Sequence, residues 1–170
     1  MKTSTCWTTL STPQGTLFLA ASATGLQGVW FDGQRHFNGP DPVWRRDDAD
    51  PVLREAAAQL RAWYAGQRRS FDLPLAPIGT PFQQAVWAEL RRIGHGCTRT
   101  YGELAAALGR PSASRAVGAA TGRNPLSLVI PCHRLVGSTG ALTGYAGGLD
   151  RKRALLAFEA HAPGVPFETA

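Results

Sequence analysis

The segment 124–145, NPLSLVIPCHRLVGSTGALTGY, constrains this chain most, because it places a Cys-His pair between an apolar run and a glycine-rich loop. The Asn-Pro pair at its start is a turn signal, and the apolar run is too short to distinguish a helix from a strand. Cysteine reacts as its thiolate, which a neighbouring base or positive charge favours. The pair Cys132-His133 therefore leaves two interpretations open: a reactive thiol, or a cysteine that is simply a small buried hydrophobic residue.

Composition sets the broad class of the protein. A chain of 170 residues, 44% of them hydrophobic, can bury one core or two small cores packed together. No apolar run approaches the roughly 20 residues that span a membrane, and the start, MKTSTCWTTL, lacks the apolar segment of a signal peptide. Three widely spaced cysteines do not make a disulfide framework. We therefore expect a cytoplasmic protein with reduced thiols and no membrane contact.

The positive charge is concentrated in the half of the chain that carries Cys132. Residues 1–78 contain 8 Lys and Arg against 7 Asp and Glu, whereas residues 79–170 contain 10 against 5, which together give the net charge of +6. A basic half is typical of proteins that bind a polyanion, with nucleic acid first, although charge also serves solubility. All but one of the cations in the second half are Arg, which favours forked contacts with phosphates or bases.

The first half predicts a small antiparallel sheet. Three short segments rich in Thr, aromatic and aliphatic residues are separated by turn residues, as in hairpins: 6–10, 16–20 and 26–31. The polar residues 32–50 predict a loop. Within it, His36 has no Cys or His neighbours at the spacing of a zinc site, so no metal is expected.

Capping signals mark several predicted helices. Asp50 caps a helix that begins at Pro51 and flanks the sheet. Thr80 and Thr100 each open a capping box, with Gln or Glu three residues later. The helix after Thr80 is predicted to end near Gly94.

A helix-turn-helix pattern follows Thr100. A short helix, a turn and a second helix over 113–121, capped by Ser112, match this motif. The second helix consists mostly of small residues, which permit close approach to a core or to a DNA groove, and Arg115 is its one large charged side chain.

The last predicted helix runs from a cap at Asp150 to Glu159. Residues 151–153 (RKR) lie in its first turn, where cations oppose the helix dipole, so we expect them to contact phosphate or carboxylate. The elements together predict an α/β (α+β) fold. It comprises an N-terminal α/β domain, 1–75, and a mostly helical, winged-helix-like domain, 80–165, with the helix-turn-helix and the active-site loop.

The segment around Cys132 resembles the active-site signature of the O6-alkylguanine-DNA alkyltransferases. The resemblance is carried by PCHR at 131–134, the Asn-Pro pair before it and Gly-Tyr-Ala-Gly-Gly at 144–148, and it extends in order from about Thr80 to Glu159. It implies direct repair of duplex DNA, in which the flipped base gives its O6-alkyl group, or the O4-alkyl group of thymine, to the protein's own cysteine. The thioether product implies that each molecule acts once.

The resemblance also implies roles for catalytic residues. Cys132 is the nucleophile, His133 takes its proton through a water molecule, and Glu159 orients the imidazole. Tyr101 rotates the flanking phosphate and protonates the leaving guanine at N3. Asn124 supports the site by holding the Cys132 segment, with an ordinary turn asparagine as the alternative.

Two further sets of residues are implied for DNA and for the base. Arg115 is expected to fill the vacated base stack, and the other DNA contacts are Ser112, Ser114, Ala116, Arg123 and Tyr101. The substrate pocket is expected to comprise Pro131, Tyr145, Ala146 and Gly147. Ala146 departs from relatives with a serine there, so we expect weaker or broader recognition. The resemblance implies no cofactor and a monomer on double-stranded DNA that carries O6-alkylguanine, with cooperative binding left open.

Three other classes compete with this interpretation. A non-catalytic alkylated-DNA binder shares the fold but lacks the cysteine, so Cys132 argues against it. A helix-turn-helix regulator would read an operator sequence, but Arg115 and two serines offer little for direct readout. A cysteine hydrolase would need an oxyanion hole and many turnovers.

Overall fold

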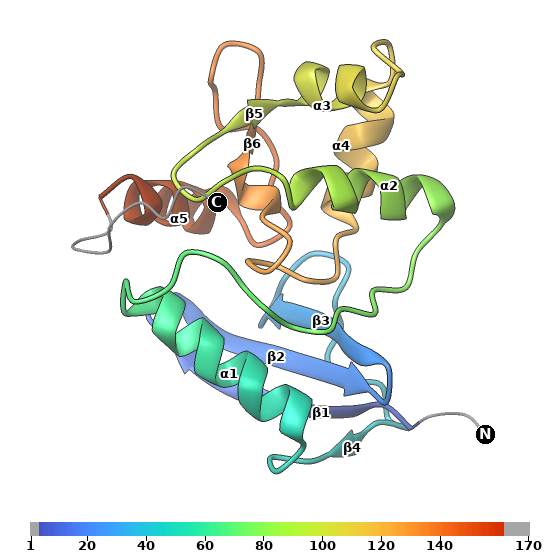
Figure 1. Ribbon diagram of the computed structural model, residues 1–170, viewed down its shortest axis with the longest axis vertical. Helices are drawn as coiled ribbons and strands as arrows, with labels where there is room; N and C mark the ends of the chain where they lie inside the picture. The colour runs from blue at the N-terminus through green and yellow to red at the C-terminus, as the bar shows by residue number, and fades with distance from the viewer. Residues whose placement is uncertain (1–3, 162–170) are drawn as a thin grey trace.

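The computed structural model describes residues 4–161 and places a sheet-and-helix half against a mostly helical half (Figure 1). The predicted α/β fold class is confirmed. The predicted tail after His161 and the predicted domain end at 165 lie outside the described residues. Within 4–161, no helix combines the length and apolarity needed to cross a membrane.

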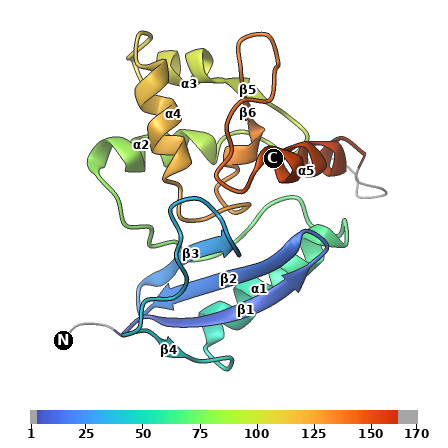
Figure 2. The ribbon, with the colours of Figure 1, turned by 180° about the vertical axis from the view of Figure 1, so that it is seen from behind.

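The N-terminal sheet is built from the three predicted strands and one that the sequence did not reveal. β1 (Cys6–Thr12), β2 (Gly15–Ser22) and β3 (Gly25–Phe31) pair antiparallel, and the sheet order is β3-β2-β1-β4 (Figure 2). β4 (Arg45–Arg46) lies in the predicted loop and pairs parallel with β1. Two residues carry too little alternation to signal a strand, so this pairing depends on tertiary contact.

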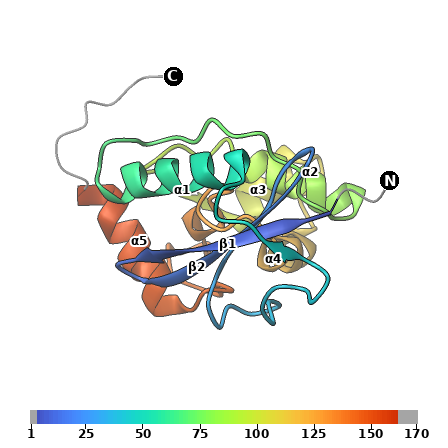
Figure 3. The ribbon, with the colours of Figure 1, turned by 90° about the horizontal axis from the view of Figure 1, so that it is seen from below.

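One face of the sheet is covered by α1 (Pro51–Tyr64), as Figure 3 shows. Asp50 accepts a hydrogen bond from the Leu53 amide and caps the helix as predicted. The buried stripe includes Leu53, Leu60 and Trp63, whose burial against the sheet stabilises each by about 1.5–3 kcal/mol. The opposite face carries an aromatic cluster: Trp7, Phe18, Trp30, Phe37 and Trp44.

The C-terminal half contains the predicted helices with some different ends. α2 (Pro81–Leu90) and α3 (Tyr101–Ala107) both begin with complete capping boxes, as predicted. The prediction that α2 extends to near Gly94 is wrong: it ends at Leu90, where bonds between residues three apart tighten the chain into a turn. A two-stranded parallel pair, β5 (Arg99–Thr100) with β6 (Leu135–Val136), joins α3 to the segment after Cys132.

Two predicted caps are wrong. α4 (Ser114–Gly122) is preceded by Ala113, with no side-chain cap, because Ser112 lies inside the turn that the Ala113 amide closes on Arg110 O and is therefore one residue too early to cap. α5 (Leu149–His161) already includes Asp150 in its first turn. The Asp150 carboxylate pairs with Arg153 at 3.2 Å, so it acts within the helix.

The segment that leads to Cys132 lies along the seam between the two halves. Its backbone bonds to the sheet at Val29, whose amide donates to Pro125 O at 2.8 Å and whose carbonyl accepts from the Ser127 amide at 3.0 Å. Buried Leu128 has a φ of 71°, a left-handed conformation that costs about 1–3 kcal/mol in a non-glycine residue. The hydrogen bonds with Val29 stabilise this strained turn. This turn determines the position of Cys132, four residues later.

Candidate active site

Cys132 begins a short 3₁₀ helix, η1 (Cys132–Arg134), and lines a cavity at the junction of α4 and the loop that follows β6. The cavity encloses about 180 Å³, less than the roughly 300–1,000 Å³ of pockets for drug-sized ligands, and this size suits a single flat group. Cys132 is only 5% exposed, so a reacting group must enter the cavity to reach the sulfur.

The cavity wall combines predicted and unpredicted residues. Tyr145 and Ala146 line it as expected, whereas Pro131 and Gly147 are buried and do not. The other lining residues come from α4, from Tyr101 and Gly144, and from the N-terminal half: Gly118, Ala119, Thr121, Gly122, Arg35 and His36. Residues 35 and 36 could not be assigned to the site from the sequence, because only the folded β3–β4 loop brings them to the cavity.

Asn124 braces the loop that carries Cys132. Its side-chain amide donates to Ile130 O at 2.8 Å, and its carbonyl oxygen accepts from the Leu126 amide at 2.9 Å. These bonds join both ends of its own loop. Both bonds lie within the segment that leads to Cys132, the first residue of η1.

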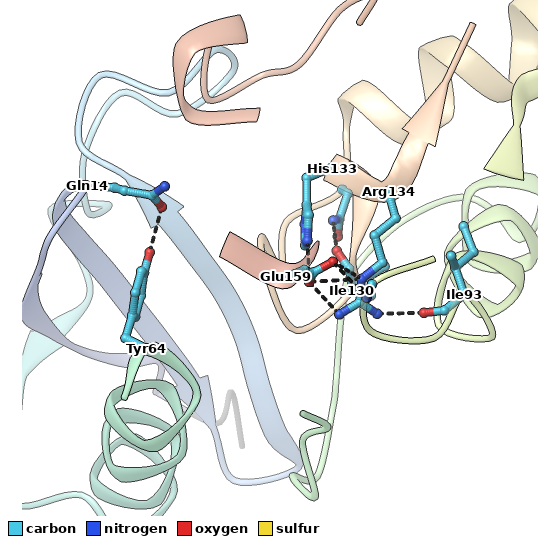
Figure 4. A network of polar contacts seen from close by, with 9 residues as sticks. Gln14, Tyr64, Ile93, Ile130, His133, Arg134 and Glu159 are labelled. Carbon is cyan, nitrogen blue, oxygen red and sulfur yellow. Dashed lines mark hydrogen bonds and ion pairs between the residues drawn. The ribbon is translucent and has the colours of Figure 1, made fainter. Parts of the chain in front are cut away.

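His133, Glu159 and Arg134 form a buried ionic network (Figure 4). His133 Nε2 lies 2.8 Å from Glu159 Oε1, and the Arg134 guanidinium donates to both carboxylate oxygens of Glu159 and to the Ile93 carbonyl. The side chains of His133 and Glu159 are 0% exposed. A charge this deeply buried is tolerated only when it is paired and fully hydrogen-bonded, and Arg134 supplies that pairing.

The electrostatics of the site favour neutral Cys132 and His133 beside an ionised Glu159. Burial raises the pKa of the Cys132 thiol, although the Asn124 hydrogen bond and the Lys152 charge oppose this. Burial also lowers the pKa of His133, against the effect of Glu159. Burial alone would raise the pKa of Glu159, but His133 and Arg134 together bring it down to about 2. The imidazole is therefore a neutral base at pH 7.

His133 has one ring nitrogen free for that base role. Nε2 faces Glu159, and Nδ1 is buried without a hydrogen-bond partner among residues 4–161. Buried polar atoms of this kind are ordinarily satisfied by water. This arrangement suits a solvent-mediated contact between Nδ1 and a nearby thiol.

Lys152 is an unpredicted member of the site. Its side chain is fully buried, and its ammonium donates to the carbonyls of Leu135, Thr143 and Gly144. The sequence-based expectation that residues 151–153 contact phosphate or carboxylate is wrong for Lys152, because three converging carbonyls replace the anion. The bonds fix the loop above the cavity and bring a positive charge near Cys132.

Two tyrosines flank the cavity. The Tyr101 hydroxyl donates to Thr143 O at 2.9 Å, so it must leave this bond before it can contact a substrate. Burial raises the pKa of both Tyr101 and Tyr145. Both phenols therefore remain protonated at pH 7 and can act as donors.

The outer face of α4 lies beside the cavity and is open. Its inner face buries Val117, Ala120 and Thr121, and the Trp87 indole donates to Ala120 O at 2.9 Å. The predicted DNA-contact residues of this region are exposed, except half-buried Ser114: Ser112, Ser114, Arg115, Ala116 and Arg123. Because the exposed side chains of α4 are mostly small, its backbone is accessible. Arg115 lies near the start of the helix and Arg123 follows its end.

His95 is a further buried group that the sequence did not assign to the site. It is 7% exposed and packs edge-on against Trp63, with ring centres 6.1 Å apart. The next residue, Gly96, donates its amide to Glu159 Oε2 at 3.4 Å. No group of three His, Cys, Asp or Glu side chains in the described part of the chain could hold a metal ion.

Comparisons with known proteins agree over nearly the whole chain. Residues 81–161 match the family described as 6-O-methylguanine DNA methyltransferase, DNA binding domain, and residues 5–77 match the family described as its ribonuclease-like domain. The chain is 49% identical over 148 residues to the methylated-DNA–protein-cysteine methyltransferase of Methanosarcina acetivorans, with 86% of this chain and 93% of the relative covered.

Two more similarities support the same assignment. The constitutive methylated-DNA–protein-cysteine methyltransferase of Bacillus subtilis is 42% identical over 151 residues, which cover 88% of this chain and 92% of the relative. The crystal structure of Mycobacterium tuberculosis OGT in complex with DNA superposes with a TM-score of 0.85 and 41% identity, and covers 92% of this chain and 94% of that one.

Proposed function

We propose, since the chain belongs to the 6-O-methylguanine DNA methyltransferase family, that it repairs duplex DNA by moving the alkyl group of O6-alkylguanine onto Cys132. The observation that carries this proposal is the cavity, which holds a buried thiol at its base and lies beside an exposed helix of small residues. An alkylated base inside a duplex is out of reach, so the nucleotide must be flipped into the cavity. Arg115 fills the gap that it leaves.

The chemistry is an in-line displacement at the alkyl carbon. A bond forms between Cys132 Sγ and that carbon as the bond from carbon to guanine O6 breaks. The thiol proton passes through water to His133 Nδ1, and Glu159 stabilises the imidazolium that forms. Tyr101 gives its hydroxyl proton to guanine N3, so the base leaves neutral. Burial favours the neutral forms of Cys132 and His133, so the thiol proton has to leave during the reaction and a neutral imidazole is present to accept it.

The cavity wall recognises the flipped base, and residues around the cavity contact the duplex. Tyr145 and Ala146 contact the flipped base, Gly147 lies against the Tyr145 ring, and Asn124 holds the segment that leads through Pro131 to Cys132. The contacts with the duplex come from α4 and its flanks: Ser112, Ser114, Arg115, Ala116 and Arg123. The protein acts as a cytoplasmic monomer on DNA.

The product is a thioether, which neither water nor another thiol reverses easily, so the protein is consumed. With excess duplex that carries radiolabelled O6-methylguanine, transfer should stop at about one methyl group per protein molecule. Continued turnover would contradict the proposal, and so would transfer that is independent of Cys132.

Ala146 supports a broader substrate range that includes O4-alkylthymine. Its methyl side chain lines the cavity and cannot donate a hydrogen bond to a base oxygen. The change Ala146→Ser should raise the rate with O6-methylguanine relative to the rate with O4-methylthymine. An unchanged ratio of the two rates would remove the basis for this claim.

A further inference from the structure

Arg151 joins three parts of the chain that are distant in sequence. From the first turns of α5, its Nε donates to Gln14 O in the β1–β2 turn and its Nη1 donates to Gly147 O, each at 3.0 Å. The guanidinium also lies over the Phe31 ring, 4.6 Å from its centre. Figure 3 shows α5 beside the end of the β1–β2 hairpin. Arg151 thus connects the N-terminal sheet to the segment that supports the cavity wall.

The cavity wall is supported from behind by this connection. Buried Gly147 is enclosed between two rings, because a Cβ there would lie 2.7 Å from Tyr145 Cε1 and 3.3 Å from Phe31 Cδ2. One residue earlier, Ala146 O accepts a hydrogen bond from the Arg35 amide at 2.9 Å. Tyr145 and Ala146, which line the cavity, are therefore held in place by contacts with the N-terminal half.

The contacts of Arg151 use the shape of a guanidinium and not only its charge. Within residues 4–161, Arg151 makes no ion pair with a carboxylate, and both acceptors are backbone carbonyls. The turn fits closely around it, since a Cβ at Gly15, where φ is +112°, would lie 3.2 Å from Arg151 Nη2. A lysine ammonium lacks the planar fork that donates in two directions while stacking on a ring.

We propose that Arg151 is a positioning residue that fixes the wall formed by Tyr145 and Ala146, and that it thereby sets which alkyl groups react quickly. The inference rests on the proposed function of Cys132. Arg151 does not itself line the cavity. A wall held in one position keeps a small alkyl group aligned with the sulfur, and a misplacement near 1 Å can reduce a rate on the order of a hundredfold. A larger adduct fills the cavity and aligns itself through its own contacts.

The test is single-turnover kinetics on the full chain with duplexes that carry O6-methylguanine or O6-benzylguanine. The variants are Arg151→Met and Arg151→Lys. The matched controls are Arg153→Met and Arg153→Lys, because exposed Arg153 pairs only with the exposed carboxylate of Asp150 in the described structure. The maximal rate and the half-saturating DNA concentration are measured separately, at a temperature where circular dichroism shows every variant to be folded.

We expect both Arg151 variants to lower the maximal rate with O6-methylguanine about tenfold. The half-saturating DNA concentration should stay within about twofold, and the ratio of benzyl rate to methyl rate should rise. Hydrogen exchange should quicken at residues 144–148 but not in β2. The Arg153 variants should match the unmodified protein in all of these measurements.

Three results would overturn the inference. The first is full activity in Arg151→Lys, because a charge alone would then suffice. The second is weaker DNA binding with an unchanged maximal rate and a salt slope smaller by about one, which is the behaviour of a phosphate contact. The third is an unchanged benzyl-to-methyl ratio. Failure of the unmodified protein to transfer any alkyl group would instead refute the proposed function.

Discussion

The two halves of the molecule bury different kinds of side chain. The N-terminal half has an almost entirely apolar interior, and its ion pairs, such as Arg46 with Asp48, lie in solvent. Every buried charged side chain and both buried imidazoles belong to the C-terminal half of the described chain: His95, His133, Arg134, Lys152 and Glu159. Buried charge seldom adds to stability, so we infer that the buried charges of the C-terminal half serve the site, whereas the N-terminal half supports it.

The strongest contrast should come from the buried cysteines, one in each half. Cys132→Ala should abolish alkyl transfer while the variant still binds alkylated duplex, because only the nucleophile is removed. Cys6→Ala should keep the full transfer rate, since the Cys6 thiol donates to the Ala21 carbonyl within the sheet and does not line the cavity. Radiolabel transfer and duplex binding measure both effects. Residual transfer by Cys132→Ala would show that another group carries the reaction.

Breaking one ion pair in each half should give the next largest difference. Glu159→Gln leaves Arg134 buried without its anion, so we expect the free energy of unfolding to fall by about 3–5 kcal/mol. The transfer rate should also fall on the order of a hundredfold, because the imidazolium that forms on His133 loses the negative charge that stabilises it.

The comparison variant in the N-terminal half is Arg45→Ala, which breaks the exposed pair with Asp47. It should cost less than about 1 kcal/mol and leave the rate unchanged. Urea unfolding and single-turnover rates measure both variants. Similar losses of stability from the two changes would contradict the contrast between the halves.

A substitution in the core of the N-terminal half should lower the free energy of unfolding without changing the transfer rate. Leu60→Ala removes a fully buried side chain from α1, so it should cost about 2–5 kcal/mol of unfolding free energy. The rate per folded molecule should remain that of the unmodified protein, because Leu60 lies in α1 and does not line the cavity. A large loss of rate at a temperature where the variant is folded would show that the sheet takes a direct part in the reaction.

Acid should destabilise the C-terminal half through Glu159. Its pKa in the folded protein, about 2, lies below the ordinary value of 4.5, so the folded state favours the carboxylate. The resulting stabilisation, on the order of 3 kcal/mol, is present above about pH 4.5 and is lost as the pH falls toward 2. Urea unfolding between pH 7 and pH 3 should show this loss in the unmodified protein and a smaller one in Glu159→Gln. Equal losses would assign the acid sensitivity to other groups.

The sequence predicted most where local signals decide the structure. Strands β1 and β2 with the turn between them, the Asp50 cap and the capping boxes at Thr80 and Thr100 were all found as predicted. Each of these signals depends on neighbours within a few residues. The predicted cap at Ser112 is wrong because Ser112 lies inside the turn that joins α3 to α4, and α4 begins only at Ser114.

The parts of the site that the sequence missed depend on tertiary contacts. From the sequence, Lys152 would be expected on the surface of a helix. It is buried because the carbonyls of Leu135, Thr143 and Gly144 converge on its ammonium group. Arg134 could be noticed beside His133, but its pairing with Glu159 spans 25 residues. The left-handed turn at Leu128 gave no signal, because leucine seldom adopts it and only the surrounding bonds impose it.

The smallest expected effect concerns DNA binding by exposed arginines of the two halves. Arg115→Ala, on the open face of α4, should weaken binding to alkylated duplex about tenfold, since the vacated stack loses its filler. Arg45→Ala, on β4, should leave binding within about twofold. Fluorescence anisotropy at one fixed salt concentration measures both. Equal losses would mean that DNA contacts general positive charge and not the α4 face.

The central claim is that Cys132 accepts one alkyl group and keeps it. The most direct measurement is the intact mass of the protein after incubation with a duplex that contains O6-methylguanine, followed by mapping of the modified peptide. We expect the mass to increase by one methyl group, and peptide mapping to locate that group on Cys132. An unchanged mass, or a methyl group on Cys97 or any other residue, would contradict it.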